Sequence, residues 1–244
     1  GCLSRLTVLG ASGNLRALTV VLLFAVVAHA TLKGVLAPAR VALGAVTVPL
    51  GETAALAALP GGAALWAGLI AAGAGALAWR SGARPRDLVL GATIGLLVPL
   101  GWIGTGFVLY DDFDPVALQS LSFTLPAADT LFWAVAATAI APNFGVGLIG
   151  GVLLGALAAA LATGRFRWES FDSPGQTGRY AAGAALMGVG GVLAGGCTLG
   201  AGLSGVATLG TSAILALAAI AGGALATDAA LGRRAGRAAP VPAE

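Results

Sequence analysis

Two cysteines have the most distinctive chemistry in this chain, because each lies beside glycine in an apolar stretch. Cys197 follows Gly195 and Gly196, and Cys2 follows Gly1. Their separation matches no zinc-binding pattern such as Cys-x-x-Cys, and no disulfide framework is indicated. We therefore expect two single thiols that act as weak S–H donors and offer a soft sulfur surface to a ligand. The simpler alternative for Cys197 is a small buried hydrophobe at a tight helix contact.

The segment around Cys197 combines glycines with hydroxyl side chains. Residues 188–205 read GVGGVLAGGCTLGAGLSG, and the glycines are placed to break or crowd a helix within an apolar region. We expect half-helices that begin after Cys2 and Cys197 and direct freed backbone N–H groups and positive helix ends toward an anion. The candidate substrate-binding residues are Cys2, Gly195, Gly196, Cys197, Thr198, Gly200, Gly202 and Ser204.

The surroundings of the two cysteines are similar to one another. The sequence LGAS follows Cys2 at residues 9–12, LGTS follows Cys197 at residues 209–212, and both copies then enter an apolar segment. The spacing differs by five residues between the copies. We expect an internal repeat whose halves place the two cysteines face to face. Since an apolar run leads into Cys197, we also expect that the native chain has a helix before Cys2.

The composition predicts a membrane protein built of helices. Hydrophobic residues make up 58% of the chain and charged residues only 9%, and the mean hydropathy is +0.94. A soluble fold is excluded, because an ordinary soluble domain carries about 25% charged residues. The 39 glycines among 244 residues suit helices that approach closely in lipid. A net charge of +3 gives no support to nucleic-acid binding, and no cofactor or metal site is indicated.

Apolar runs recur along the chain and predict a polytopic all-α bundle with re-entrant or broken helices. The run at 129–141 is too short to cross a bilayer, so we interpret it as a re-entrant half-helix. Residues 42–62 are expected to form a loop or a surface-lying helix. We assign 1–232 to one transmembrane domain, with one half around Cys2 and the other around Cys197, and 233–244 to a disordered cytoplasmic tail. The predicted apolar segments are 15–37, 63–79, 87–109, 129–141, 143–163, 179–195 and 205–227.

Charge placement predicts which loops face the cytoplasm. Basic residues gather at 80–86, 165–167 and 233–237, and such clusters favour the cytoplasmic side. Lys33 and Arg40 fit this pattern less well, which leaves the orientation of the N-terminal half open. The acidic group of Asp111, Asp112 and Asp114 is interpreted as a solvated loop.

The glycine and cysteine pattern resembles the YeeE/YedE family of membrane proteins, sulfur-transport permeases that include bacterial thiosulfate importers. Further likeness lies in Phe171–Pro174 and in Phe123–Pro126. The residues that match the family signature are Gly195, Gly196, Cys197, Thr198, Gly200, Gly202, Leu203, Ser204 and Gly205.

This resemblance implies an hourglass-shaped bundle in the inner membrane, with cysteines along a path that handle the terminal sulfur of the substrate. The family places more than two cysteines on that path, whereas this chain has two. We expect a permease rather than an enzyme, acting on thiosulfate or a related small sulfur anion. Its thiols are expected to be protonated at rest, because a thiolate would repel a dianion.

Two other functions remain open at this stage. The chain could be a membrane sulfurtransferase or redox partner in which Cys197 carries a persulfide to a cytosolic acceptor protein. It could also be a structural subunit. The gathering of glycines, thiol and hydroxyls at one mid-membrane point argues against a scaffold, since freed backbone groups at that depth normally line a cavity.

Overall fold

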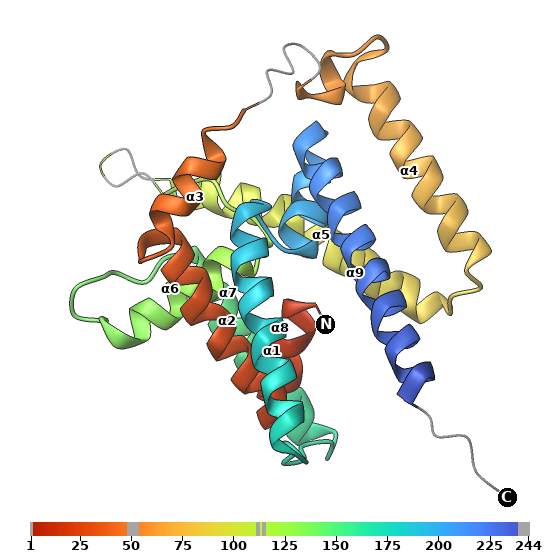
Figure 1. The fold of residues 1–244 in the computed structure, drawn as a ribbon. Coiled ribbons are helices and arrows are strands. Elements are labelled where there is room, and N and C mark those ends of the chain that lie inside the picture. Colours follow the sequence, from red (N-terminus) through yellow and green to blue (C-terminus); the bar gives the residue numbers. More distant parts are fainter. Residues whose placement is uncertain (1, 48–53, 111–112, 114–115, 239–244) are drawn as a thin grey trace, which may run out of the picture.

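The computed structural model describes residues 2–47, 54–110, 113 and 116–238. These residues form a helical bundle (Figure 1), and the β-structure found among them is limited to two isolated bridges. The all-α prediction is therefore confirmed. The elements are α1 (Leu3–Ala11), α2 (Leu15–Lys33), α3 (Ala37–Gly44), η2 (Leu56–Ala58), α4 (Gly62–Arg80), α5 (Pro85–Ile103), η3 (Gly104–Val108), α6 (Thr124–Val135), α7 (Phe144–Ala162), α8 (Pro174–Leu193), η4 (Thr198–Gly205) and α9 (Thr211–Ala238).

Six of the described helices are long and apolar enough to cross a membrane. This finding confirms a multi-pass membrane protein. The candidate spans are Leu15–Lys33, Gly62–Arg80, Pro85–Val108, Phe144–Ala162, Pro174–Gly205 and Thr211–Ala230.

Side-chain caps set the starts of three spans. The side-chain oxygens of Asn14 and Asn143 accept hydrogen bonds from the backbone N–H groups of Ala17 and Val146, at the starts of α2 and α7. Ser173 caps α8 in the same way, and Pro174 occupies the first position of that helix, where no N–H is needed. The predicted segments at 63–79 and 143–163 lie within one residue of the observed helix bounds.

The core of the bundle forms around α2, which packs against α1, α6 and α8. Phe24 and Ala28 on α2 and Ala128 on α6 are fully or almost fully buried. A Cβ atom added to Gly188 on α8 would lie 3.0 Å from the side chain of Val27. Small residues at this crossing therefore allow the two helices to approach closely, as is usual in membrane bundles.

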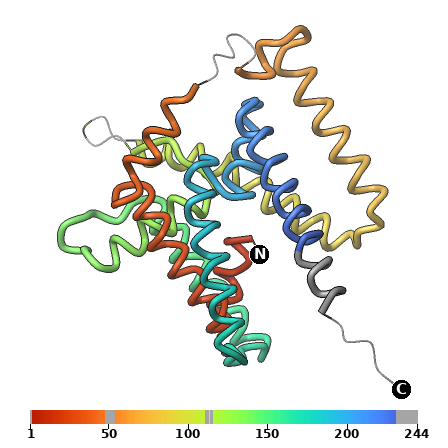
Figure 2. Tube along the Cα trace, viewed as in Figure 1, coloured from red at the N-terminus to blue at the C-terminus, as the bar shows by residue number. Residues whose placement is uncertain are grey.

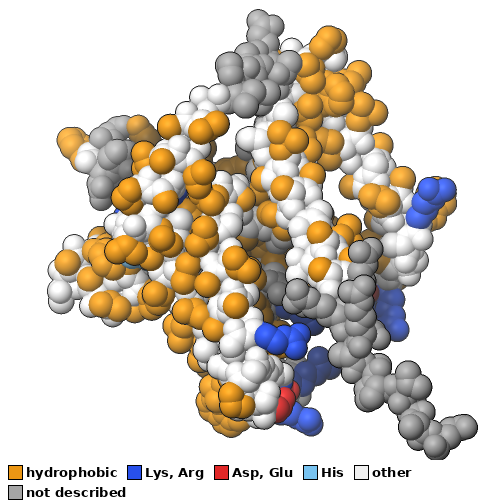
Figure 3. All heavy atoms as spheres, viewed as in Figure 1, with side chains coloured by type: hydrophobic (Ala, Val, Ile, Leu, Met, Phe, Trp, Pro, Cys, Tyr) orange, Lys and Arg blue, Asp and Glu red, His pale blue; other side chains and the backbone are white. Residues whose placement is uncertain are grey.

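The outer helices expose apolar surface. The tube view shows α4, α5 and α9 beside the α2-centred core (Figure 2), and α4 has no buried residue. Leu77 and Trp79 on α4 are 71% and 89% exposed. Hydrophobic side chains cover much of the visible surface (Figure 3). Lipid tails are as apolar as leucine, so this surface is compatible with a stable fold in a bilayer.

The structure corrects several predicted boundaries. The short helix expected at 129–141 begins earlier, as α6 at Thr124, and ends at Val135. It is too short to cross a bilayer, as predicted. The run predicted at 15–37 ends at Lys33, because Gly34 stops α2 before α3 begins at Ala37. The loop at 42–62 contains the end of α3 and η2, with 48–53 outside the described residues.

The solvated acidic loop and the C-terminal tail both stay predictions. Asp111, Asp112 and Asp114 lie outside the described residues, so their interpretation is unchanged. Helix α9 continues to Ala238, into the segment 233–244 expected as a tail, and residues 239–244 are not described.

The three basic clusters of the sequence lie at the ends of helices. In Figure 1 the α7–α8 loop and the C-terminal end of α9 point toward the lower part of the view, whereas the α4–α5 turn lies at mid-height at the right edge. These are the segments that carry the three basic clusters. The N-terminal end of α1 lies at mid-height (Figure 1), between the two ends of the bundle.

Candidate functional site

Each cysteine stands at the start of a short helix. Cys2 precedes α1 and Cys197 precedes η4, both with extended backbone (ψ 138° and −174°). The first N–H groups of a helix have no partner within it, and its N-terminal end carries partial positive charge. A short helix therefore follows each cysteine, as predicted, and the role of these helix ends in anion binding stays a prediction.

The break before Cys197 follows from Gly195. Its φ of +72° lies in the left-handed region that favours glycine. The N–H of Gly196 donates to the carbonyl of Gly191 at 2.9 Å, and that of Gly195 donates to the carbonyl of Val192 at 3.2 Å. This is a Schellman ending, which closes α8 and leaves Cys197 in extended backbone.

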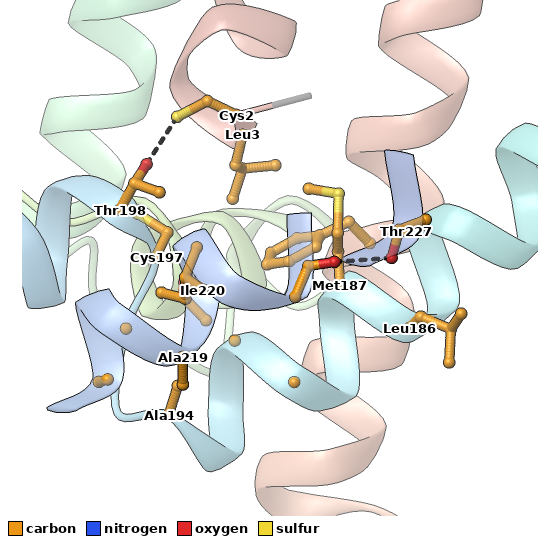
Figure 4. Close-up of a pocket in the computed structure, with 17 residues that line it drawn as sticks. Cys2, Leu3, Leu186, Met187, Ala194, Cys197, Thr198, Ala219, Ile220 and Thr227 are labelled. Atoms are coloured by element: carbon orange, nitrogen blue, oxygen red, sulfur yellow. Dashed lines mark hydrogen bonds between the residues drawn. The ribbon is translucent and has the colours of Figure 1, made fainter. Parts of the chain in front are cut away.

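A direct contact joins the two cysteine segments. Cys2 Sγ lies 2.9 Å from Thr198 Oγ1 and 3.1 Å from Ser4 Oγ. Figure 4 shows the thiol of Cys2 pointing toward Thr198, with Cys197 next to it. Both cysteines are half-buried and neither forms a disulfide. Residues almost 200 positions apart, one from each half of the chain, thus share one site.

A cavity of about 500 Å³ opens beside this contact. Its wall includes Cys2, Gly196, Cys197 and Thr198 together with residues of α8 and α9 (Figure 4). None of the described residues that line it is charged. Any anion in this space must therefore be stabilised by dipoles, N–H groups, thiols and hydroxyls rather than by a cationic side chain.

A second cavity of about 300 Å³ adjoins the same helix break. Gly195, Gly200 and Ser204 line it, and the Ser204 hydroxyl donates to the Leu121 carbonyl at 2.7 Å. Four of the predicted site residues thus line the first cavity and three line the second. The segment from Gly195 to Ser204 forms part of the wall of both.

The remaining predicted residue, Gly202, lines neither cavity. A Cβ atom there would lie 3.0 Å from Leu217 Cδ1, so Gly202 lets η4 approach α9. Gly200 similarly faces Ser122, whose Oγ would lie 2.8 Å from an added Cβ atom. These glycines have a packing role in the structure.

Thr124 and Phe24 also line the first cavity, although neither residue was predicted to bind substrate. Thr124 belongs to the Phe-Thr-Leu-Pro sequence that resembles the family, and this resemblance was the sequence feature that could have identified Thr124 as a site residue. Among the described residues, no group of three or more His, Cys, Asp or Glu is placed to hold a metal ion.

The order of structural elements after Cys2 is the same as the order after Cys197. After α1, Gly13 has a φ of +102° just before α2 begins, and after η4, Leu209 has a φ of +56° just before α9 begins. Each half thus reads as cysteine, short helix, left-handed turn and long helix. The internal repeat itself stays a prediction.

Six helices able to span a membrane, with short helices that meet beside a cavity, indicate a multi-pass membrane protein, and broken helices at such a cavity are typical of transporters. The family model described as sulphur transport matches residues 1–226, and the chain belongs to this family. The resemblance drawn from the glycine and cysteine pattern is confirmed, and membership places the chain among transporters rather than enzymes.

A curated relative is the thiosulfate transporter TsuA of Escherichia coli (strain K12). The chain is 35% identical to it over 123 residues, which are 49% of this chain and 32% of the relative. The matched segment therefore spans about a third of the length of that relative.

Proposed function

We propose that this protein imports thiosulfate, or a closely related sulfur anion, across the inner membrane through the site at Cys2 and Cys197. The contact between Cys2 and Thr198 beside an uncharged cavity is the observation that carries this proposal. Sulphur-transport membership and the name of the relative support the substrate class.

Charge compensation is the first requirement of such a path. An anion inside a bilayer loses the stabilisation of water, which costs many kcal/mol unless donors replace it. The N-terminal ends of α1 and η4 provide backbone N–H groups, and Cys2 and Thr198 provide S–H and O–H groups. In the empty site the thiol and the hydroxyl bind one another, so neither polar group is left unpaired. The substrate replaces that contact.

Discrimination by sulfur is the second requirement. Thiosulfate has three charged oxygens and one soft terminal sulfur, whereas sulfate has oxygens alone. Neutral thiols donate a weak S–H hydrogen bond and match a polarizable sulfur better than a hard oxygen. The two cysteines therefore favour the terminal sulfur without forming a covalent bond to it.

Passage between the two cavities is the third requirement. The segment from Gly195 to Ser204 borders both cavities and contains a π-helix. Such π-helices are rare in proteins, and those that do occur often lie at functional sites. We propose that this glycine-rich segment shifts to let the anion pass, and that Gly196, Gly200 and Gly202 allow the shift because they carry no side chain.

Uptake of radiolabelled thiosulfate by cells that lack other thiosulfate carriers tests the proposal. With the protein expressed in full, we expect Cys197→Ala to abolish most uptake and Cys2→Ala to reduce it. Thr93→Ala is the matched control, because Thr93 is exposed on α5 and its hydroxyl bonds only to Val89 of the same helix. Normal uptake by Cys197→Ala would remove that thiol from the mechanism.

The alternative is sulfur transfer through a persulfide on Cys197 to a cytosolic acceptor protein. Mass spectrometry of the protein after exposure to thiosulfate separates the two functions. Permeation predicts an unmodified Cys197, whereas a lasting sulfur adduct on that residue would favour transfer.

A further inference from the structure

Thr124 differs from the other buried polar side chains of the described residues. Thr7, Thr31, Thr105 and Ser120 are also buried, and each donates a hydrogen bond to a backbone carbonyl. Thr124 is only 4% exposed, and its Oγ1 has no hydrogen-bond partner among the described residues. A buried hydroxyl without a partner is unfavourable, so its presence here calls for a ligand.

The position of Thr124 at the start of α6 explains why no local carbonyl takes its hydrogen bond. It is the first residue of the helix, so no helical carbonyl lies one turn before it. Phe123 at the cap position provides no side-chain cap, and Pro126 in the first turn has no N–H to donate. The positive end of α6 is therefore uncapped by side chains in the described part of the chain.

The hydroxyl belongs to the same cavity as the two cysteines. Thr124 and Gly191 both line the 500 Å³ cavity with Cys2 and Cys197. A Cβ atom added to Gly191 would lie 3.4 Å from both Oγ1 and Cγ2 of Thr124. The backbone of Gly191 on α8 therefore packs against Thr124 at the cavity wall, with no side chain of its own between them.

From this geometry we infer that Thr124, with the N-terminal end of α6, binds the oxygen end of the transported anion. The inference rests on the proposed function and assigns an orientation to it. The charged oxygens lie at Thr124, where a hydroxyl and a helix N-terminus act as hard donors, and the terminal sulfur lies toward Cys2 and Cys197. Thr124 is thus a specificity-determining residue for the sulfonate group.

The test compares Thr124→Val, which removes the hydroxyl but keeps the shape, with Thr124→Ser, which keeps the hydroxyl. In proteoliposomes with the full protein, Thr124→Val should raise the KM for thiosulfate about tenfold or more, the loss expected for a hydrogen bond to a charged group. Thr124→Ser should stay near the wild-type KM. Thr93→Val on α5 serves as the matched control, with no change expected.

Thermal unfolding without substrate separates binding from a structural role. Because the hydroxyl has no partner in the empty protein, Thr124→Val should leave Tm unchanged or raise it, while affinity falls. A structural hydroxyl would instead give a lower Tm with an unchanged KM, and that result would overturn the inference.

A second pair of variants tests the same site without changing Thr124. Gly191→Ala places a methyl group against the Thr124 hydroxyl and should raise the KM, whereas Gly183→Ala, on α8 but outside the cavity wall, adds a methyl group to open space and should not. If the wild-type protein fails to transport thiosulfate, the proposed function fails. If it transports thiosulfate and neither Thr124→Val nor Gly191→Ala alters the KM, the orientation inference alone is wrong.

Discussion

Cys2 and Cys197 illustrate how two single thiols from distant parts of the chain become one site. Cys2 contacts Thr198, the residue after Cys197, and both cysteines border the same cavity. Both are half-buried, so a small reagent that enters the cavity can reach them. Occupation of the cavity by an anion should therefore shield both thiols together.

We expect N-ethylmaleimide to modify Cys2 and Cys197 in the empty protein, and thiosulfate to slow both reactions. Sulfate at the same concentration is the control, because it has charged oxygens but no soft sulfur. Peptide mass spectrometry after timed labelling measures each cysteine separately. Protection of one cysteine alone would show that the two thiols do not share a substrate position.

At the scale of single helices, the end of α8 depends on the left-handed backbone of Gly195. Replacement by alanine should destabilise the protein by about 1 to 2 kcal/mol, because a Cβ atom is unfavourable at φ +72°. Gly190→Ala in the interior of α8 meets no atom within 4 Å and should stabilise by up to about 1 kcal/mol. Thermal unfolding in detergent compares the two, and equal shifts would contradict the Schellman assignment.

The turn between α1 and α2 is held by the loop after α7. Leu15 N–H donates to the Glu169 carbonyl at 2.8 Å, and Glu169 N–H donates to the Gly13 carbonyl at 3.2 Å. A Cβ atom on Gly13 would overlap the carbonyl oxygen of Arg167. This attachment positions α1, and with it Cys2 at the other end of that helix.

Gly13→Ala should therefore lower both Tm and thiosulfate uptake, although Gly13 lies at the far end of α1 from Cys2. We expect a stability loss of about 2 kcal/mol or more from the positive φ and the overlap together. Arg16→Gln is the comparison, because the acidic partners of Arg16, Asp172 and Glu169, have side chains that are 76% and 51% exposed, and such pairs contribute less than about 1 kcal/mol. Similar losses for both variants would contradict the prediction, because the ion pairs would then contribute as much to the position of α1 as the backbone fit at Gly13.

The elements that the sequence predicted well are those whose signal is local. Hydropathy located α4 and α7 within one residue, because each presents nineteen mostly apolar residues between polar ends. It did not identify α1, and it placed the start of α6 too late. These helices are too short for a window of about 20 residues, and they are stabilised by packing against α2 rather than by their own sequence.

The candidate site was also predictable only where its sequence signal is local. The glycines around Cys197 indicate a broken helix, and the structure contains it. Thr124 could not be assigned from sequence, because its function depends on α6, α8 and the cysteine segments meeting at one cavity. The assignment of Gly202 to substrate binding stays a prediction, since the structure places this residue against Leu217.

At the scale of the whole molecule, the packing of α2 orients the N-terminal half, which charge alone left open. The start of α2 contacts Glu169 in the α7–α8 loop, and this loop carries the basic residues Arg165 and Arg167. A cytoplasmic position of the loop therefore places the start of α2 at the cytoplasm. Because α2 is long and apolar enough to cross the membrane, we expect its other end, with Lys33, to face outward.

Cysteine labelling with a membrane-impermeant maleimide tests this orientation in a background where Cys2 and Cys197 are replaced by alanine. Val35 after α2 is 88% exposed and Trp168 in the α7–α8 loop is 73% exposed, so both suit single cysteine substitutions. We expect Val35→Cys to react in intact cells, and Trp168→Cys to react only after the membrane is opened. Ser81→Cys, in the exposed turn between α4 and α5, should behave like Trp168→Cys because that turn carries another basic cluster. Reaction of Val35→Cys and Trp168→Cys from the same side would contradict α2 as a membrane span, since the two positions lie beyond opposite ends of that helix.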